Sequence, residues 1–205
     1  MDAPRKPDLA LARIHGWLCG DGRVESRFEK GKHSPHLEVR FFPDDKHVAH
    51  LFCTNFDARF GRTPIIYDTR LSEGCFTVRL RDKGICKFIL SIGPFGHYRW
   101  RMPCFDYQAE KIEWVKCFFD DEAHVNESGN CIQVKSVNRI GLRKVGESLI
   151  GLGIGATLYG PYTQRNPKWS SYSMLVIPES ELRLYQSLIG FNHVGKNSTL
   201  MSLLR

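Results

Sequence analysis

No stretch of this sequence comes close to the roughly 20 consecutive apolar residues that a membrane-spanning helix needs. The most apolar run, residues 149–159, is short and is interrupted by glycines. The amino terminus lacks the apolar segment of a secretory signal. The seven cysteines are odd in number and include no CxxC pair, which argues against a disulfide framework and against a zinc site. We therefore expect an intracellular protein, cytoplasmic or organellar, that keeps its thiols reduced and does not enter a membrane.

Basic residues outnumber acidic ones in this chain. Its 205 residues include 29 Lys and Arg against 22 Asp and Glu, which gives a formal net charge of +7. Hydrophobic residues make up 42% and charged residues 25%, the composition of a globular protein. The excess of positive charge suits a polyanionic partner, either a nucleic acid or an acidic membrane surface.

The expected secondary structure repeats once along the chain. Hydrophobic periodicity and capping residues predict the order αββαββα twice, an α+β fold. Helices are expected at residues 9–20, from 43 through 56, 83–92, 106–121, 138–152 and 179–189, with Asp8, Asp106 and Asn138 as caps. Strands are expected at residues 23–29, 36–41, 65–69, 76–81, 123–126, 131–135, 156–163 and 171–177. The repeat predicts two halves, residues 1–92 and 106–205, joined by a linker at 93–105 and packed with pseudo-twofold symmetry in a monomer.

The first helix of each half ends in acidic residues. In the first half, Gly16 and Gly20 share one helical face, which allows a second helix to approach closely, and Asp21 follows. In the second half, residues 120–122 are all acidic and end with Glu122. A carboxylate at a helix C-terminus is disfavoured by up to about 1 kcal/mol, because that end carries partial negative charge. If the two helices pack side by side, their acids repel each other, and divalent cations would offset the repulsion. The pattern favours a metal site for phosphodiester hydrolysis over solvated acids that merely open a turn.

These two segments resemble the paired motifs of single-chain LAGLIDADG homing endonucleases. Gly16-Trp-Leu-Cys-Gly-Asp-Gly22 is a close match, and Cys117-Phe-Phe-Asp-Asp-Glu-Ala123 is a looser one. The resemblance implies that the motif helices form the seam between the halves, with Gly16, Gly20, Cys117 and Asp121 along it. It also implies two curved antiparallel sheets that form a DNA-binding saddle.

The same resemblance implies the catalytic site. Asp21 and Glu122 would be the catalytic metal ligands, assisted by the carbonyl groups of Gly20 and Asp121. The metal would be Mg²⁺, with Mn²⁺ as a substitute, while Ca²⁺ would support binding without cleavage.

The sequence also departs from the family pattern. Cys117 and Ala123 stand where glycines are usual, and Asp121 stands where a small residue is usual. The family often places a polar or basic residue at the end of the second strand of each half. Here those positions fall on Phe42 and Pro43 in the first half, and on Ser136 and Val137 in the second. Lys46 and Lys135 are the nearest basic candidates for an accessory role.

Strand alternation predicts which side chains face DNA. The core-facing set is Val24, Phe28, Leu37, Val39, Phe41, Phe76, Val78 and Leu80. The DNA-facing set in the first half is Arg23, Glu25, Arg27, Glu29, His36, Glu38, Arg40, Arg70, Thr77, Arg79 and Arg81. The set in the second half is Asn126, Gln133, Lys135, Tyr159, Gln164, Arg165 and Lys168. Arginine can bond guanine and acids can accept from cytosine, so the mixture suits base reading. The alternative is that these are simply the solvated faces of amphipathic strands.

Together these features predict a site-specific endonuclease that cuts both strands of a long, asymmetric duplex, and the family resemblance implies that the cut leaves 3′ overhangs. The alternative is a non-cutting binding protein of the same family, in particular a maturase that binds intron RNA, with a transcriptional regulator as a third case. The segment Gly190-Phe-Asn-His-Val-Gly-Lys-Asn197 nearly matches a phosphate-binding loop. Asn197 replaces the required hydroxyl and a helix precedes the segment, so we interpret it as a turn.

Overall fold

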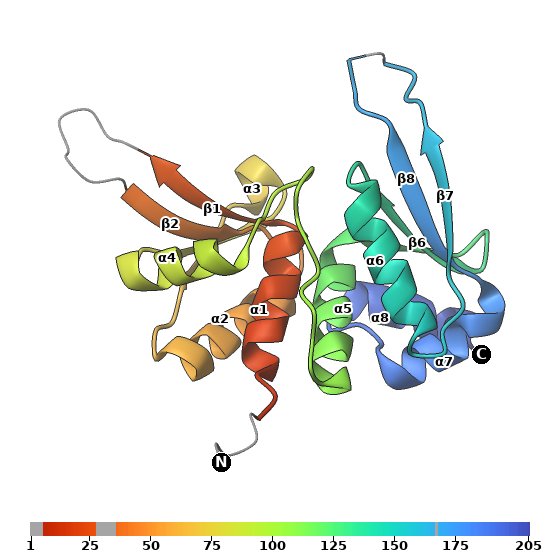
Figure 1. The fold of residues 1–205 in the computed structure, drawn as a ribbon, viewed down its shortest axis with the longest axis horizontal. Helices are drawn as coiled ribbons and strands as arrows, with labels where there is room; N and C mark the ends of the chain where they lie inside the picture. Colours follow the sequence, from red (N-terminus) through yellow and green to blue (C-terminus); the bar gives the residue numbers. More distant parts are fainter. Residues whose placement is uncertain (1–5, 28–35, 167) are drawn as a thin grey trace.

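The computed structural model describes residues 6–27, 36–166 and 168–205. Those residues form eight helices and two four-stranded antiparallel sheets, the α+β fold predicted from the sequence (Figure 1). The expected strand residues Phe28 and Glu29 lie outside the described residues. In the part of the chain that is described, no helix combines the length and the apolar character that crossing a membrane requires.

The chain runs twice through the same order of helices and strands. The first run is α1 (Leu9–Cys19), β1 (Gly22–Arg27), β2 (His36–Phe41), α2 (Lys46–Phe60), β3 (Ile65–Asp68), α3 (Arg70–Glu73), β4 (Phe76–Leu80) and α4 (Lys83–Ile92). The second is α5 (Gln108–Glu122), β5 (Ala123–Asn126), β6 (Cys131–Ser136), α6 (Arg139–Ile150), β7 (Thr157–Tyr162), β8 (Tyr172–Ile177) and α7 (Glu179–Leu188), followed by α8 (Val194–Leu203). The strand orders, β1-β2-β4-β3 and β5-β6-β8-β7, are equivalent.

Helices α1 and α5 lie side by side at the centre, and the two sheets lean away from each other on either side of them (Figure 1). Asp8 starts α1, because its carboxylate accepts a hydrogen bond from the backbone N–H of Leu11 at 3.0 Å. The helices touch most closely at Gly16, where an added Cβ would lie 2.6 Å from the carbonyl oxygen of Trp114. Glycine at this position therefore permits the crossing, as the sequence predicts for the seam.

Each sheet covers its own hydrophobic core. The described members of the predicted core-facing set are buried or packed against the core around α2. The second core surrounds Trp114 and Phe118 of α5, whose rings stack at 5.1 Å. Cys117 of α5 belongs to the first core, and Cys19 of α1 to the second, so the motif helices exchange side chains across the seam.

Three local expectations are wrong. Helix α5 begins after Tyr107, so Asp106 is not its cap. Residues 70–73, where the sequence predicts neither helix nor strand, form the single turn α3, which Gly74 ends with a positive φ of 75°. The segment 190–197, expected as a turn, is non-helical only over residues 190–193; residues 194–197 begin α8, which His193 caps, because its Nδ1 accepts a hydrogen bond from the N–H of Lys196 at 3.2 Å.

Candidate metal and nucleic-acid site

The acids of the two motifs meet at the same end of the seam. Asp21 follows Gly20, which is the C-cap of α1, and Glu122 is the last residue of α5. Between them, the Asp121 carboxylate accepts a hydrogen bond from the backbone N–H of Asp21 at 3.4 Å. An added Cβ at Gly20 would lie 2.6 Å from the same carboxylate. Asp121 is thus the acid that crosses the seam, which explains how a carboxylate fits where the motif that this segment resembles usually has a small residue.

The surroundings of these acids disfavour their charged forms. Burial raises the pKa of Glu122 to about 7, and repulsion from Asp21 adds to the effect. Burial followed by repulsion from Asp21 and Asp120 raises the pKa of Asp121 well above its ordinary value. Asp21 itself is exposed, yet partial loss of water still raises its pKa. Clustered acids with raised pKa values are typical of functional sites and of metal sites that lack their cation.

Asp120 has a different role, because its carboxylate is buried and fully engaged. It accepts hydrogen bonds from Nε1 of Trp17 at 3.3 Å, from the backbone N–H and side-chain amide of Asn192 at 2.7 and 2.8 Å, and from the backbone N–H of His193 at 3.0 Å. One of these donors lies on α1 and the others precede α8. Asp120 therefore joins both halves, next to the half-buried Asp121 and Glu122.

Lys196 lies at the carboxyl end of α5. Its Nζ donates hydrogen bonds to the carbonyl oxygens of Phe119 at 3.5 Å, of Asp120, and of Asp121 at 2.8 Å. The same ammonium group lowers the pKa of Asp21, Asp121 and Glu122 against the effect of burial. Lys196 thus brings a positive charge to the acids from α8, the helix that follows the twice-repeated order of helices and strands.

The donor set fits a hard divalent cation only in part. Among residues 6–27, 36–166 and 168–205, no three His, Cys, Asp or Glu side chains gather in the arrangement of a metal cage. The Asp21 and Glu122 carboxylates are close enough for Asp21 to raise the pKa of Glu122 by repulsion, and the carbonyl groups of Asp120 and Asp121 at the end of α5 accept hydrogen bonds from Lys196. Magnesium is commonly held in this way, by one or two carboxylates together with water and substrate phosphates.

The strand ends near the site carry the side chains expected from the sequence. Phe42 lies beneath the guanidinium of Arg23, which is 4.8 Å from its ring centre. In the other half, Ser136 and Val137 line a cavity of about 490 Å³ together with Glu122 and Lys135. Lys135 therefore lines the same cavity as Glu122, whereas Lys46 is exposed near Asp68, whose pKa it helps to lower.

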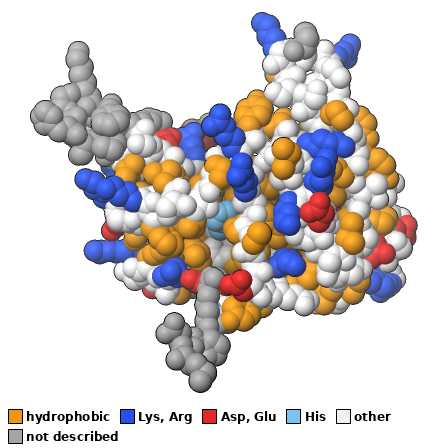
Figure 2. Space-filling view, in the orientation of Figure 1, with side chains coloured by type: hydrophobic (Ala, Val, Ile, Leu, Met, Phe, Trp, Pro, Cys, Tyr) orange, Lys and Arg blue, Asp and Glu red, His pale blue; other side chains and the backbone are white. Residues whose placement is uncertain are grey.

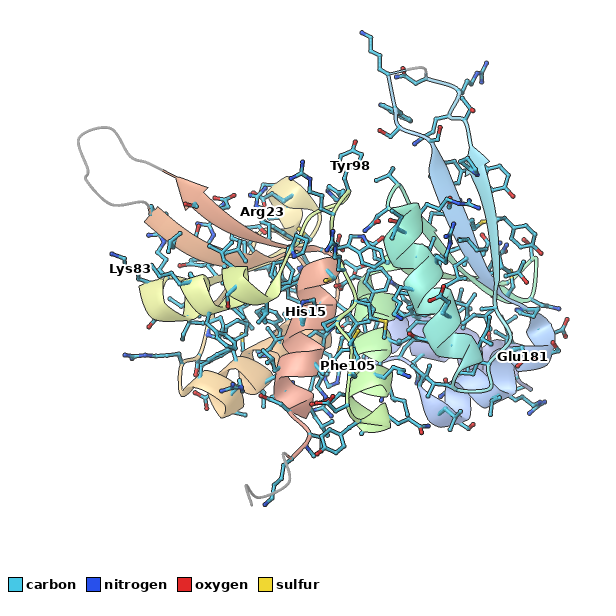
Figure 3. The ribbon with its side chains drawn as sticks, viewed as in Figure 1. His15, Arg23, Lys83, Tyr98, Phe105 and Glu181 are labelled. Carbon is cyan, nitrogen blue, oxygen red and sulfur yellow. The ribbon has the colours of Figure 1, made fainter. Side chains whose placement is uncertain are left out.

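The linker completes this cavity from above. His97 and Tyr98 line it, and Figure 3 shows Tyr98 at the tip of the linker, above the ends of α1 and α5 and between the two sheets. The Tyr98 hydroxyl lies 3.2 Å from Oγ of Ser170 in the β7–β8 loop. His97 also lowers the pKa of Asp21 by its charge. The linker thus borders the site.

The first sheet presents a network of paired charges. Arg23 contacts Glu25 at 2.8 Å, Arg40 contacts Glu25 at 3.6 Å and Glu38 at 2.5 Å, and Arg81 contacts Glu38 at 2.9 Å. The register places Arg23 opposite Arg40 and Glu25 opposite Glu38 on one face of the sheet. Each arginine therefore pairs with an acid two residues along its own strand, and Arg40 also pairs diagonally with Glu25. Glu38 is fully buried between its arginines, so the sheet shows guanidinium groups more than carboxylates.

Other predicted contacts of this sheet are placed as follows. Arg79 lies over the Tyr67 ring at 5.3 Å. Thr77 is buried and hydrogen-bonded to Thr69 at 2.9 Å and to Glu73 of α3 at 3.1 Å. Arg70 is exposed beside Asp68, and His36 is half-buried. Glu29 and the Arg27 side chain lie outside the described structure.

The second sheet presents amides, aromatic rings and one lysine. Lys135, Met174 and Tyr159 form one row across β6, β8 and β7. Gln133 is half-buried, Asn126 holds the β5–β6 turn through Gly129 at 3.2 Å, and Gln164 donates to the Ser170 carbonyl at 2.9 Å. Arg165 and Lys168 are exposed in the β7–β8 hairpin, where Figure 2 shows basic side chains at the tip.

Sequence reasoning did not assign Asp120, Lys196 or His97 to the site. The signal for Lys196 was present in the segment that resembles a phosphate-binding loop. Backbone N–H groups of this segment do bind anions, but the anions are carboxylates of the same chain. The Asp120 carboxylate accepts hydrogen bonds from the N–H groups of Asn192 and His193. The Asp45 carboxylate accepts one from the N–H of Val194 at 3.0 Å. Only the tertiary structure identifies these partners.

Comparison with known proteins identifies the fold. No family model and no curated protein matches the sequence. Among solved structures, I-DmoI in complex with DNA and Ca aligns with a TM-score of 0.68 and 15% identity, over 95% of this chain and 98% of that one. I-DmoI in complex with DNA and Mn aligns with a TM-score of 0.66 and 17% identity, over 89% and 96%. Full-length DUF199/WhiA from Thermatoga maritima aligns with a TM-score of 0.59 and 9% identity, over 100% of this chain and 63% of that one. The chain therefore has the fold of I-DmoI, a single-chain, two-motif LAGLIDADG homing endonuclease.

Proposed function

We propose that this chain, which has the homing endonuclease fold, is a monomeric, site-specific DNA endonuclease that uses divalent metal to cut both strands of a duplex. The observation that carries the proposal is the meeting of Asp21 and Glu122 at the end of the seam. Each comes from an equivalent motif helix, and their environment raises the pKa of both carboxyl groups. Two carboxylates in such an environment destabilise the fold when they are charged, and bound divalent cations would offset this destabilisation.

In this proposal, Asp21 and Glu122 would hold the divalent metal, with carbonyl groups of Gly20 and Asp121 as further ligands. When bound there, the metal would supply Lewis-acid chemistry, the activation of a water molecule and the stabilisation of the leaving oxygen. The family resemblance implies 3′ overhangs and Mg²⁺ as the working metal. Lys135 lies on the same cavity as Glu122 and is the residue of the strands best placed to contact the phosphate.

The two sheets would bind the duplex on either side of the seam. Arg23, Arg40 and Arg81 of the first sheet combine base-reading geometry with positive charge, and the acids between them fix their orientation. The second sheet and the β7–β8 hairpin add Tyr159, Arg165 and Lys168, which are exposed. Ion-paired arginines on the first sheet, together with exposed hydrogen-bonding side chains on the second sheet and its hairpin, are suited to a long asymmetric site.

The test is a selection of bound sequences from a randomised long-duplex library in Ca²⁺, followed by transfer of the bound pool to Mg²⁺. One extended sequence should be enriched and then cut on both strands. Asp21→Asn and Glu122→Gln should retain affinity within a few-fold and lose double-strand cleavage. Glu147→Gln removes an equal charge from an exposed pair on α6 and should cut like wild type. Cleavage of both strands by Asp21→Asn at the wild-type rate would rule out the proposed site.

A second candidate is a non-cutting member of the family, in particular an intron RNA maturase. The observation that favours it is the pair of strand ends, where Phe42 packs against Arg23 and Val137 takes the other position. A maturase should prefer structured RNA to duplex DNA and should tolerate loss of both acids. Enrichment of no duplex in the selection, with tight binding of structured intron RNA, would favour this candidate.

A further inference from the structure

The position of Lys196 has a consequence for metal binding. Its ammonium group contacts three successive carbonyl oxygens at the end of α5, including that of Asp121 at 2.8 Å. Helix ends leave such carbonyl groups without helical partners and with partial negative charge. A cation at this position therefore stabilises both the helix end and the acids beside it.

Lys196 is held in place by contacts with both halves. The turn that precedes it donates backbone hydrogen bonds to Asp120 of α5 and, through Val194, to Asp45 at the start of α2. His193 lies 3.1 Å from Asp44. Because α8 begins in this turn, the lysine is anchored at the seam rather than left on a mobile tail.

The Asp121 carbonyl group is also an expected metal ligand. A divalent cation and the Lys196 ammonium group cannot share that oxygen without strong repulsion, since both are positive. The lysine must withdraw when metal binds, or the metal must bind without that ligand. Either case makes Lys196 oppose metal binding at the second motif.

We propose that Lys196 is a built-in counter-cation of the acid cluster, which stabilises the metal-free protein and competes with divalent cations at the end of α5. The proposal rests on the metal-binding function proposed above for Asp21 and Glu122. Lys196 is in this sense a positioning residue for the acids, and its effect is on metal affinity. If Lys196 were only a structural cap of α5, its removal would leave metal affinity unchanged or weaken it.

The experiment compares Ca²⁺ binding by calorimetry, and stabilisation by Ca²⁺ in thermal unfolding, for wild type and three variants of the whole chain. Lys196→Met keeps the side-chain length and removes the charge; we expect it to be less stable without metal and to bind Ca²⁺ about tenfold more tightly, the scale of one charge–charge interaction. Lys196→Arg should behave like wild type. Lys83→Met removes an equal charge from the exposed start of α4, at the far edge of the first half (Figure 3), and should also behave like wild type.

Unchanged or weaker Ca²⁺ binding by folded Lys196→Met would overturn the proposal. If that variant does not fold, Lys196→Gln, which keeps a donor for the carbonyl groups, must show the tighter binding instead. Asp21→Asn separates the two proposals. If it loses Ca²⁺ binding while Lys196→Met matches wild type, only the role of Lys196 fails. If it binds Ca²⁺ like wild type, the metal site itself fails and the inference fails with it.

Discussion

Nε1 of Trp114 donates a hydrogen bond to Nδ1 of His15 across the seam, over 2.9 Å. An indole nitrogen can only donate, so Nδ1 must accept and the ring proton must be on Nε2. Nε2 lies 3.0 Å from the carbonyl oxygen of Ile92 and donates to it. A neutral, buried histidine therefore joins α1 to α5 and to the end of α4.

This histidine should make the fold sensitive to acid. Burial lowers the pKa of His15 to about 4, from an ordinary value of 6.5. The unfolded chain therefore takes up the proton first, and the stabilisation present above pH 6.5 is lost as the pH falls toward 4, at up to about 1.4 kcal/mol per pH unit. His15→Gln has no such titration, so the difference between its unfolding free energy and that of wild type should shrink over this range in urea melts. A difference that stays constant from pH 7 to 4.5 would contradict the assignment.

Gly16→Ala should destabilise the protein by about 1–3 kcal/mol, because the added methyl group overlaps backbone and forces the motif helices apart. The overlap is with the Trp114 carbonyl oxygen, 2.6 Å away. Gly84→Ala is the matched control in a helix, where the nearest atom is an Asp82 oxygen at 3.4 Å. It should be neutral or stabilising by up to about 1 kcal/mol through helix propensity. Equal effects of the two substitutions in chemical denaturation would show that the seam is not tightly packed at Gly16.

Asp120→Asn should cost about 2–4 kcal/mol, because an amide nitrogen would face N–H donors that now share a carboxylate. Those donors come from Trp17, Asn192 and His193, so the change should also loosen α8 from α5. Hydrogen exchange of α8 amides would show the loosening. Asp57→Asn, whose carboxylate accepts from Thr63 at the surface over 2.9 Å, is the control and should cost much less. Similar losses for both would mean that Asp120 does not hold the seam.

Under the proposed DNA-binding function, Glu38→Gln should make DNA binding tighter but less selective. Glu38 binds Arg40 and Arg81 at 2.5 and 2.9 Å, and its neutral replacement releases their guanidinium groups toward phosphates. The slope of log K against log salt for random duplex should steepen by about one for each arginine that gains a phosphate. Glu147→Gln removes the same charge from α6 and should leave the slope unchanged. An unaltered slope for Glu38→Gln would mean that the arginines remain directed at other partners.

Local patterns predicted much of this fold. Period-two alternation placed Val39 and Phe41 in the core, and the acidic helix ends identified Asp21 and Glu122, which the structure brings to one end of the seam. Both inferences depend on residues that are near one another in sequence, where periodicity and helix geometry act directly.

The rest depends on partners that are distant along the chain. The sequence marks Glu38 as solvent-facing, and alternation is correct about its direction, but Arg40 and Arg81 close over it and bury it. Asp120 and Lys196 acquire their roles only when a segment more than seventy residues away from α5 folds back onto it. No local pattern encodes such a contact, because its donors and acceptors are ordinary loop and helix residues until they meet.

The two sheets differ in what they present, ion-paired arginines on the first and amides, aromatic rings and a lysine on the second. The two ends of a duplex laid across both sheets would therefore meet different side chains. If the duplex were rotated end for end, it would meet guanidinium groups where it had met tyrosines. If the chain acts as the proposed monomeric endonuclease, it should therefore read the direction of its target as well as its composition, which a symmetric pair of identical subunits could not do.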